Sequence, residues 1–152
     1  MLNIPTIKSK GGRQMTGKYE HKIDAKGRLF IPSSLRDELG EVFHVTISVE
    51  DCLTAYSNES WERFLDKVKA MPIRKQTKMR PFFSNAAKCE LDSQGRFLLP
   101  QKLRDKCGLT KEVTVVGSGT FVQFWDSEKF AIIDDQETTP DNLAEVMDEL
   151  DF

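Results

Sequence analysis

Two stretches of this chain have closely similar sequences, DAKGRLFIP at 24–32 and DSQGRFLLP at 92–100. At a constant offset of 68, eight of the 17 residues from 24 to 40 are identical in the two copies, where average composition gives roughly one. These are Asp24, Gly27, Arg28, Pro32, Leu35, Arg36, Asp37 and Gly40, which match Asp92, Gly95, Arg96, Pro100, Leu103, Arg104, Asp105 and Gly108. Two copies are too few for a solenoid. The repeat therefore predicts two half-domains that pack about a pseudo-two-fold axis.

Each copy has the pattern of two strands, a short helix and two further strands. Asp24 and Gly27 suit the first and fourth positions of a type I turn. A left-handed Gly27 then closes a three-residue hairpin whose returning strand is 28–31. Pro32 ends that strand, because proline has no N–H for a ladder. Ser33 is expected to cap the helix that follows, and Gly40 to end it.

The remaining pattern predicts strand pairs and a helical linker. Strands are expected at 42–48 and 53–56, with counterparts at 113–116 and 121–125. Ser57 begins a longer helix, with a shorter counterpart at 127–133. Residues 71–87 are expected to be helical, with a kink at Pro81. The predicted fold class is therefore mainly β with short helices (α+β), built from two pseudo-two-fold β-β-α-β-β repeats.

Charge and composition divide the chain into a basic body and an acidic tail. Residues 134–152 hold eight acidic residues and no Lys or Arg, whereas residues 1–133 hold 22 basic and 16 acidic residues, a net charge of +6. A basic body is compatible with a polyanionic partner. The expected organisation is one duplicated domain at 15–133 between two flanking segments. Its parts are a flexible basic leader at 1–14, repeat 1 at 17–70, a linker at 71–86, repeat 2 at 87–133 and the acidic tail at 134–152.

The cysteines and the hydropathy pattern argue against a metal site and a membrane segment. Cys52, Cys89 and Cys107 are odd in number and form no CxxC pair, which indicates unpaired thiols in a reducing cytosol. Cys107 repeats an apolar helix position and is expected to be a small buried residue. No apolar run reaches membrane-spanning length. We therefore expect no cofactor, no metal, no small-molecule substrate and no membrane partner.

The paired turn motifs resemble those of the MraZ family, a group of bacterial transcriptional regulators. They are DAKGR at 24–28 and DSQGR at 92–96, supported by VTVVGSG and FVQFWD later in the chain. The resemblance covers about residues 15–130 and leaves the segments before Met15 and after Ile133 outside. It implies an AbrB-like β-barrel, with both halves in one chain, and ring-like homo-oligomers. It also implies binding to short direct repeats in promoter DNA of the division and cell wall gene cluster, with a cytoplasmic, nucleoid-associated location.

In such a family member the two turns carry the DNA contacts. Arg28 follows a glycine, so its guanidinium can reach a phosphate or a guanine edge bidentately. The expected DNA-binding residues are Lys22, Lys26, Arg28, Gln94 and Arg96, and the residues that brace the turns are Asp24, Gly27, Asp92 and Gly95. Lys22 belongs either to this surface or to an ordinary solvated strand face. Taken alone, an Asp–Arg pair of this kind is more often a weak surface ion pair; the duplication, the basic body and the resemblance favour DNA contact here. Arg36 and Arg104 are interpreted as helix-surface or inter-repeat pairs and not as DNA contacts.

Two other classes of protein compete with this interpretation. An enzyme with Asp24 and Asp92 as paired carboxylates is disfavoured, because each has an arginine four residues on that holds it ionised. Gly117-Ser118-Gly119 connects two strands and is not a nucleotide-binding loop. An AbrB-like antitoxin that binds DNA and uses its tail to hold a toxin remains the alternative. Its support is a predicted apolar helix face at Leu143, Val146, Met147 and Leu150.

Overall fold

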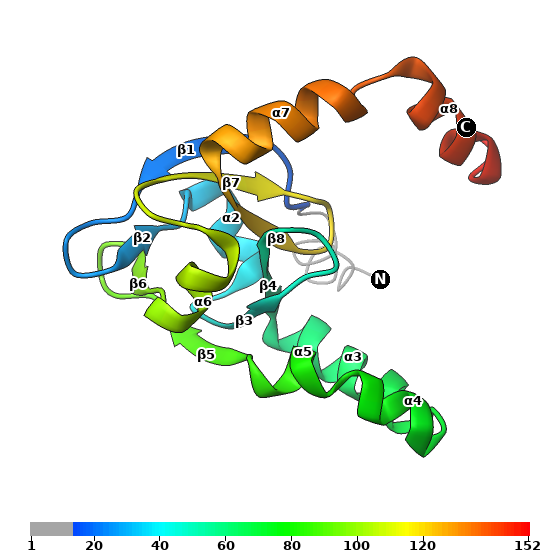
Figure 1. The fold of residues 1–152 in the computed structure, drawn as a ribbon, viewed down its shortest axis with the longest axis horizontal. Coiled ribbons are helices and arrows are strands. Elements are labelled where there is room, and N and C mark those ends of the chain that lie inside the picture. Colours follow the sequence, from blue (N-terminus) through cyan, green and yellow to red (C-terminus); the bar gives the residue numbers. More distant parts are fainter. Residues whose placement is uncertain (1–13) are drawn as a thin grey trace, which may run out of the picture.

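Strands from the two repeats are interleaved in the computed structural model, which describes residues 14–152. The predicted leader lies outside these residues, apart from Gln14. A six-stranded antiparallel sheet has the order β1-β7-β8-β4-β3-β5, and β2 pairs with β6 in a two-stranded sheet (Figure 1). The strands are β1 Lys18–Lys22, β2 Arg28–Phe30, β3 Val42–Ile47, β4 Leu53–Ser57, β5 Ala87–Glu90, β6 Arg96–Leu98, β7 Glu112–Gly117 and β8 Val122–Asp126. The fold is therefore the predicted α+β class, and each edge strand of the large sheet pairs with the other repeat.

The predicted hairpin is wrong in one respect: residues 28–31 do not form a ladder with the strand that precedes the turn, although the turn itself is present. Gly27 N donates to Asp24 O at 2.9 Å, and Asp24 N donates to Arg28 O at 3.0 Å. Beyond the turn, however, β1 pairs with β7 and β2 pairs with β6. This exchange places β2 and its copy across the open side of the large sheet, where Leu29 and Phe97 are buried. Burial of these apolar side chains favours it over a local hairpin.

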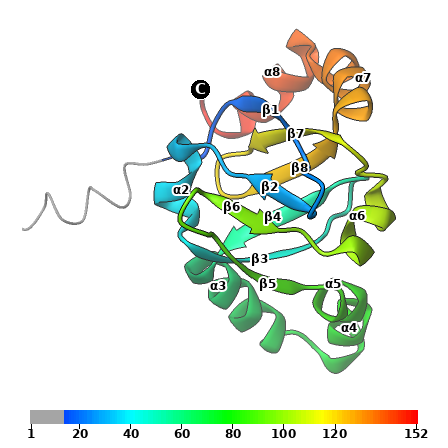
Figure 2. The same cartoon turned by 90° about the vertical axis from the view of Figure 1, so that its left-hand side faces the viewer.

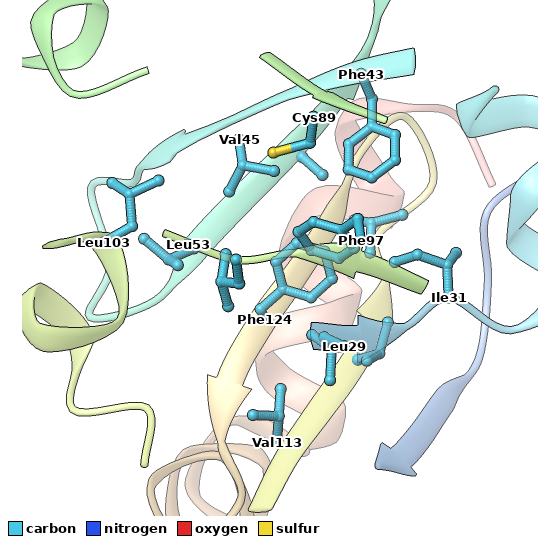
Figure 3. Packing of buried hydrophobic residues seen from close by; sticks show 14 of the residues in the cluster. Leu29, Ile31, Phe43, Val45, Leu53, Cys89, Phe97, Leu103, Val113 and Phe124 are labelled. Atoms are coloured by element: carbon cyan, nitrogen blue, oxygen red, sulfur yellow. The ribbon is translucent and has the colours of Figure 1, made fainter. Parts of the chain in front are cut away.

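The two turns connect the small sheet to both edges of the large one. The second turn repeats the first, with Asp92 N donating to Arg96 O at 2.7 Å. The two sheets surround the core and are joined by turns, without a strand ladder between β1 and β2 or between β5 and β6. Figure 3 shows Phe97 reaching the interior near Phe43 and Phe124, and its ring centroid lies 5.1 Å and 5.5 Å from theirs. The small sheet is therefore part of the core packing.

Seven helices accompany these strands within residues 14–152. They are α2 Ser33–Leu39, α3 Asn58–Lys69, α4 Ile73–Lys78, α5 Arg80–Ser84, α6 Gln101–Cys107, α7 Ser127–Glu137 and α8 Pro140–Glu149. Ser33 does not cap α2, because Pro32 occupies the N-cap position and no side chain bonds there. Ser57 does cap α3, with its hydroxyl accepting from Ser60 N at 3.2 Å. Helix α7 extends four residues beyond the predicted end at 133.

The linker folds back on α3 through an aromatic cluster. Its helix breaks at Met79, between α4 and α5, and Pro81 lies in the first turn of α5 as predicted. The Phe82 ring centroid lies 5.5 Å from that of Trp61 and 4.8 Å from that of Phe64. Within residues 14–152, none of the helices combines the length and apolar character needed to cross a membrane.

The three cysteines are free and buried. Burial raises the pKa of Cys52 and of Cys89 to about 12, so neither thiol ionises near neutral pH. Cys107 is also buried on the inner face of α6. All three behave as small apolar residues in this fold.

Each turn is held by the opposite repeat as well as by its own. Leu99 N donates to Gly27 O, and Ile31 N donates to Gly95 O, both at 2.9 Å. Two arginines support these strand ends from within their own repeats: Arg104 Nε donates to Leu99 O at 3.0 Å, and Arg36 Nε donates to Ile31 O at 2.7 Å. The Arg104 guanidinium lies so close to Gly27 that a Cβ there would be 2.8 Å from its Nη2.

Gly27→Ala is expected to lower the free energy of unfolding by about 2 kcal/mol. About 1 kcal/mol comes from a side chain at φ +84°, and a similar amount from displacing Arg104 from its hydrogen bond. Gly119→Ala is the matched control, because Gly119 has φ +88° but open space around it. Urea denaturation of both variants measures the difference; equal losses would contradict the role of Arg104.

Candidate nucleic-acid interface

The two turns and the small sheet lie on one face of the protein. Figure 2 shows β2 and β6 side by side at the centre of this face, and both turns project from the same side in Figure 1. We call residues 24–28 tip 1, residues 92–96 tip 2, and β2 with β6 the ribbon. Leu29 and Phe97 point inward. Because side chains alternate along a strand, the other ribbon residues face outward, namely Arg28, Phe30, Arg96 and Leu98.

Each tip is organised by one aspartate carboxylate. Asp24 Oδ1 accepts from Lys26 N and from Arg28 N, both at 2.9 Å. Its Oδ2 accepts from Arg28 Nε at 2.8 Å. Asp92 repeats the pattern, accepting from Gln94 N at 2.8 Å, Arg96 N at 3.0 Å and Arg96 Nε at 3.1 Å.

These hydrogen bonds keep both carboxylates ionised. The backbone N–H of Arg28 is the largest cause that lowers the pKa of Asp24, and that of Arg96 does the same for Asp92. A group whose pKa is lower in the folded state than in the unfolded state contributes stability above its unfolded pKa. That contribution is lost only as the pH falls through the lower, folded value. Both tips therefore keep their charge arrangement at neutral pH.

Arg28 and Arg96 are each fixed at Nε, whereas their Nη groups are available to a ligand. Arg28 and Arg96 each use Nε for the aspartate, and each side chain is 29% exposed. Among residues 14–152, the Nη groups of these arginines have no hydrogen-bond partner. A guanidinium held in this way presents a planar pair of donors, the geometry that suits a phosphate or a guanine edge.

The other predicted residues divide into two groups. Lys26 and Gln94 are exposed within the tips, next to the arginines. Lys22 does not lie in a tip; it is at the end of β1, directly opposite Glu112 of β7. The acidic neighbour makes Lys22 the weakest of the predicted anion contacts.

Sequence reasoning missed the part that Arg36 and Arg104 take in the tips. Each reaches the turn of the other repeat: Arg36 lies against Gly95 and Arg104 against Gly27. Arg36 also lies over the ring of Phe30, on the outer face of the ribbon, at 4.8 Å. Both arginines are half-buried, so they support the tips from the side of the protein interior. The available signal was their position in the repeat, since they recur with the same offset as the tip residues.

Comparison with known protein families agrees with the duplicated architecture. The family model described as "MraZ protein, putative antitoxin-like" matches this chain twice, over residues 15–80 and 82–149. The second match includes α8, so the acidic tail that the sequence analysis placed outside the shared core lies largely within the family region.

Curated relatives give the same assignment. A transcriptional regulator MraZ of Lachnoclostridium phytofermentans is 40% identical over 136 residues, which covers 88% of this chain and 93% of the relative. The protein of the same name from Carboxydothermus hydrogenoformans is 47% identical over 115 residues, covering 74% and 80%. That from Heliobacterium modesticaldum is 43% identical over 118 residues, covering 76% and 82%. With a duplicated match over most of its length and relatives of this similarity, the chain belongs to the MraZ family.

Proposed function

We propose that this protein is a DNA-binding transcriptional regulator that contacts DNA through the ribbon and its two tips. The observation that carries the proposal is that two identical Asp–Arg arrangements lie on one face, each with free guanidinium donors. The relatives named as transcriptional regulators support it. The role is one of binding rather than catalysis, since each carboxylate is committed to its own arginine.

The ribbon has dimensions that suit the DNA major groove. In the β2–β6 register Arg28 faces Leu98 and Phe30 faces Arg96, so the two arginines are two residues apart along the ribbon. Two residues of strand span roughly 7 Å, and the major groove of B-DNA, about 12 Å wide, admits a two-stranded ribbon. Both guanidinium groups can therefore act in one groove, with Lys26 on the adjacent phosphates and Gln94 against an adenine edge.

The proposed target is a set of short direct repeats in a promoter, that of the division and cell wall gene cluster. One chain offers only two small tips, which gives weak binding on its own. A ring-like homo-oligomer presents many tips to successive repeats, and linked contacts strengthen one another. The proposed location is accordingly the cytoplasm, in association with the nucleoid.

An antitoxin is the second candidate function. The family description includes the words antitoxin-like, and α8 exposes an apolar face on which a protein can dock. In that case the tips still bind DNA, and the tail holds a toxin. A toxin that copurifies in a defined ratio with the protein, and is released by substitutions in α8, would favour this second function.

Arg28→Ala and Arg96→Ala are each expected to weaken promoter binding by about 1–3 kcal/mol per contact, with much smaller effects on random DNA. The loss is larger in an oligomer, because every subunit carries it. Circular dichroism is expected to show an intact fold, since these side chains lie outside the core. The measurement is a titration of the upstream promoter against a scrambled fragment of equal length. Wild-type affinity of both folded variants would refute this role of the tips.

Lys26→Ala is expected to weaken both DNAs alike, because we assign Lys26 to phosphate and not to base edges. The slope of log affinity against log salt is expected to fall by about one per contact. Lys106→Ala in α6 is the control, a lysine outside both tips, and its slope should match that of the wild type. A larger effect of Lys26→Ala on the promoter than on random DNA would instead assign Lys26 to base recognition.

Arg104 is expected to act on DNA through tip 1, although it belongs to repeat 2. Arg104→Ala removes the guanidinium that lies against Gly27 of tip 1, together with its hydrogen bond to Leu99 O, and should weaken promoter binding by about 1 kcal/mol. In double-mutant cycles its effect should couple with that of Arg28→Ala and be additive with that of Arg96→Ala. The effect of Arg36→Ala should couple with that of Arg96→Ala and be additive with that of Arg28→Ala. Additivity in every cycle would reduce both arginines to general contributors to stability.

A further inference from the structure

An exposed leucine lies between the two arginines on the outer face of the ribbon. Leu98 is 61% exposed, and among residues 14–152 it is the one exposed large apolar side chain that lies in a strand. Single exposed apolar residues are ordinary on protein surfaces. This one, however, belongs to the ribbon at the centre of the face in Figure 2, where few side chains point outward. Its chemistry therefore bears on what the ribbon can contact.

Leu98 belongs to the Arg28 end of the ribbon. The two residues are directly opposite in the β2–β6 register, and opposite residues in an antiparallel pair have Cα atoms about 4.5–5.5 Å apart. The Leu98 side chain also leans toward tip 1, since a Cβ on Gly27 would lie 3.5 Å from its Cδ1. Arg96, two residues earlier on the same strand, is roughly 7 Å away. A group that contacts Leu98 is thus a neighbour of one that contacts Arg28.

The matching position in repeat 1 has a different environment. Phe30 is opposite Arg96, but its ring already contacts other side chains. The Arg36 guanidinium lies 4.8 Å from the ring centroid, and the His21 ring centroid lies 5.1 Å from it. Phe30 is accordingly only partly exposed. The outer face of the ribbon therefore departs from two-fold symmetry, with a free apolar side chain at one end and a covered ring at the other.

The major groove offers one apolar group that suits a free leucine. Thymine alone among the four bases presents a methyl group there, at C5, and apolar side chains contact it. Guanine presents N7 and O6 in the same groove, and these acceptors suit a guanidinium. Stacked bases are only about 3.4 Å apart. An arginine and a leucine that are cross-strand neighbours can therefore contact a guanine and a thymine that lie close together in one element.

We propose that Leu98 contacts the C5 methyl group of a thymine close to the guanine that Arg28 contacts. Phe30 makes no equivalent contact beside Arg96, because its ring is covered. The inference rests on the proposed function and specifies what the same surface reads. An asymmetric ribbon distinguishes the two directions along DNA, so each chain binds its element in one orientation.

The test removes the methyl group from the DNA and the leucine from the protein. Deoxyuridine, which lacks only the C5 methyl group, replaces thymidine throughout the upstream promoter fragment. The affinity of the wild type is expected to fall about fourfold for each contacted methyl group, the equivalent of one buried CH₂. Leu98→Ser should bind both DNAs with the same affinity. Ile132→Ser on α7, where the side chain is 59% exposed, is the control and should discriminate as the wild type does.

A conservative variant separates the methyl contact from an effect on the fold. Leu98→Thr keeps a methyl group that can contact thymine and is well suited to a strand. It is expected to retain part of the preference for thymine that Leu98→Ser loses. Circular dichroism of both variants should match that of the wild type, because Leu98 lies outside the core.

Single substitutions in the DNA test where the thymine lies. Deoxyuridine is placed at one thymine at a time, and 7-deazaguanine, which lacks the N7 acceptor, at one guanine at a time. Titrations at low salt keep the binding of the arginine variants measurable. The thymine whose substitution has no effect in Leu98→Ser is expected to lie closer to the guanine that is silent in Arg28→Ala than to the one that is silent in Arg96→Ala. The reverse order would contradict the assignment of Leu98 to the Arg28 end.

Two results would overturn the inference while leaving the proposed function in place. One is equal loss on methyl removal in the wild type and in Leu98→Ser, because thymine would then act through DNA shape or another residue. The other is a wild type that binds both DNAs equally. Undiminished promoter affinity of Arg28→Ala and Arg96→Ala would instead overturn the proposed function itself.

Discussion

The pairing of β2 with β6 is the interaction on which the rest of this structure depends. Three residues from each repeat form the ribbon, yet they close the open side of the six-stranded sheet and bring Leu29 and Phe97 into the core. Without this pairing, the large sheet would expose one apolar face to water. The same exchange puts both turns on one face of the molecule. Fold stability and the arrangement of the candidate interface therefore have a common origin.

The Asp–Arg pairs at the tips contribute to geometry more than to stability. Exposed ion pairs of this kind add little to stability, because solvent screens the attraction between the charges. Their value lies in preorganisation: a guanidinium fixed at Nε loses less conformational freedom when it binds an anion. Arg36 and Arg104 extend this support across the repeats by lying against Gly95 and Gly27, so that each tip depends on both halves of the chain. This mutual dependence gives a physical reason for keeping the two repeats in one domain.

Local features were predictable from the sequence, and long-range pairing was not. Asp24 and Gly27 defined the turn, Gly40 defined the end of the first short helix, and Pro81 defined the break in the linker. The hairpin ladder was wrong because strand partners depend on burial across the whole sheet, which a local pattern does not encode. Ser33 failed as a cap because Pro32 already holds the N-cap position. The part of Arg36 and Arg104 in the tips depends on the strand exchange, and so it became visible only in three dimensions.

The central claim is that the ribbon is the surface that faces DNA. It is tested most directly by placing a photoreactive residue at position 98, where Leu98 is 61% exposed on the outer face of the ribbon. The same residue at position 132, on α7 and similarly exposed, is the comparison. The account predicts light-dependent cross-links to promoter DNA from position 98 and none from position 132. Cross-links from position 132 alone, in a protein that still binds the promoter, would contradict it.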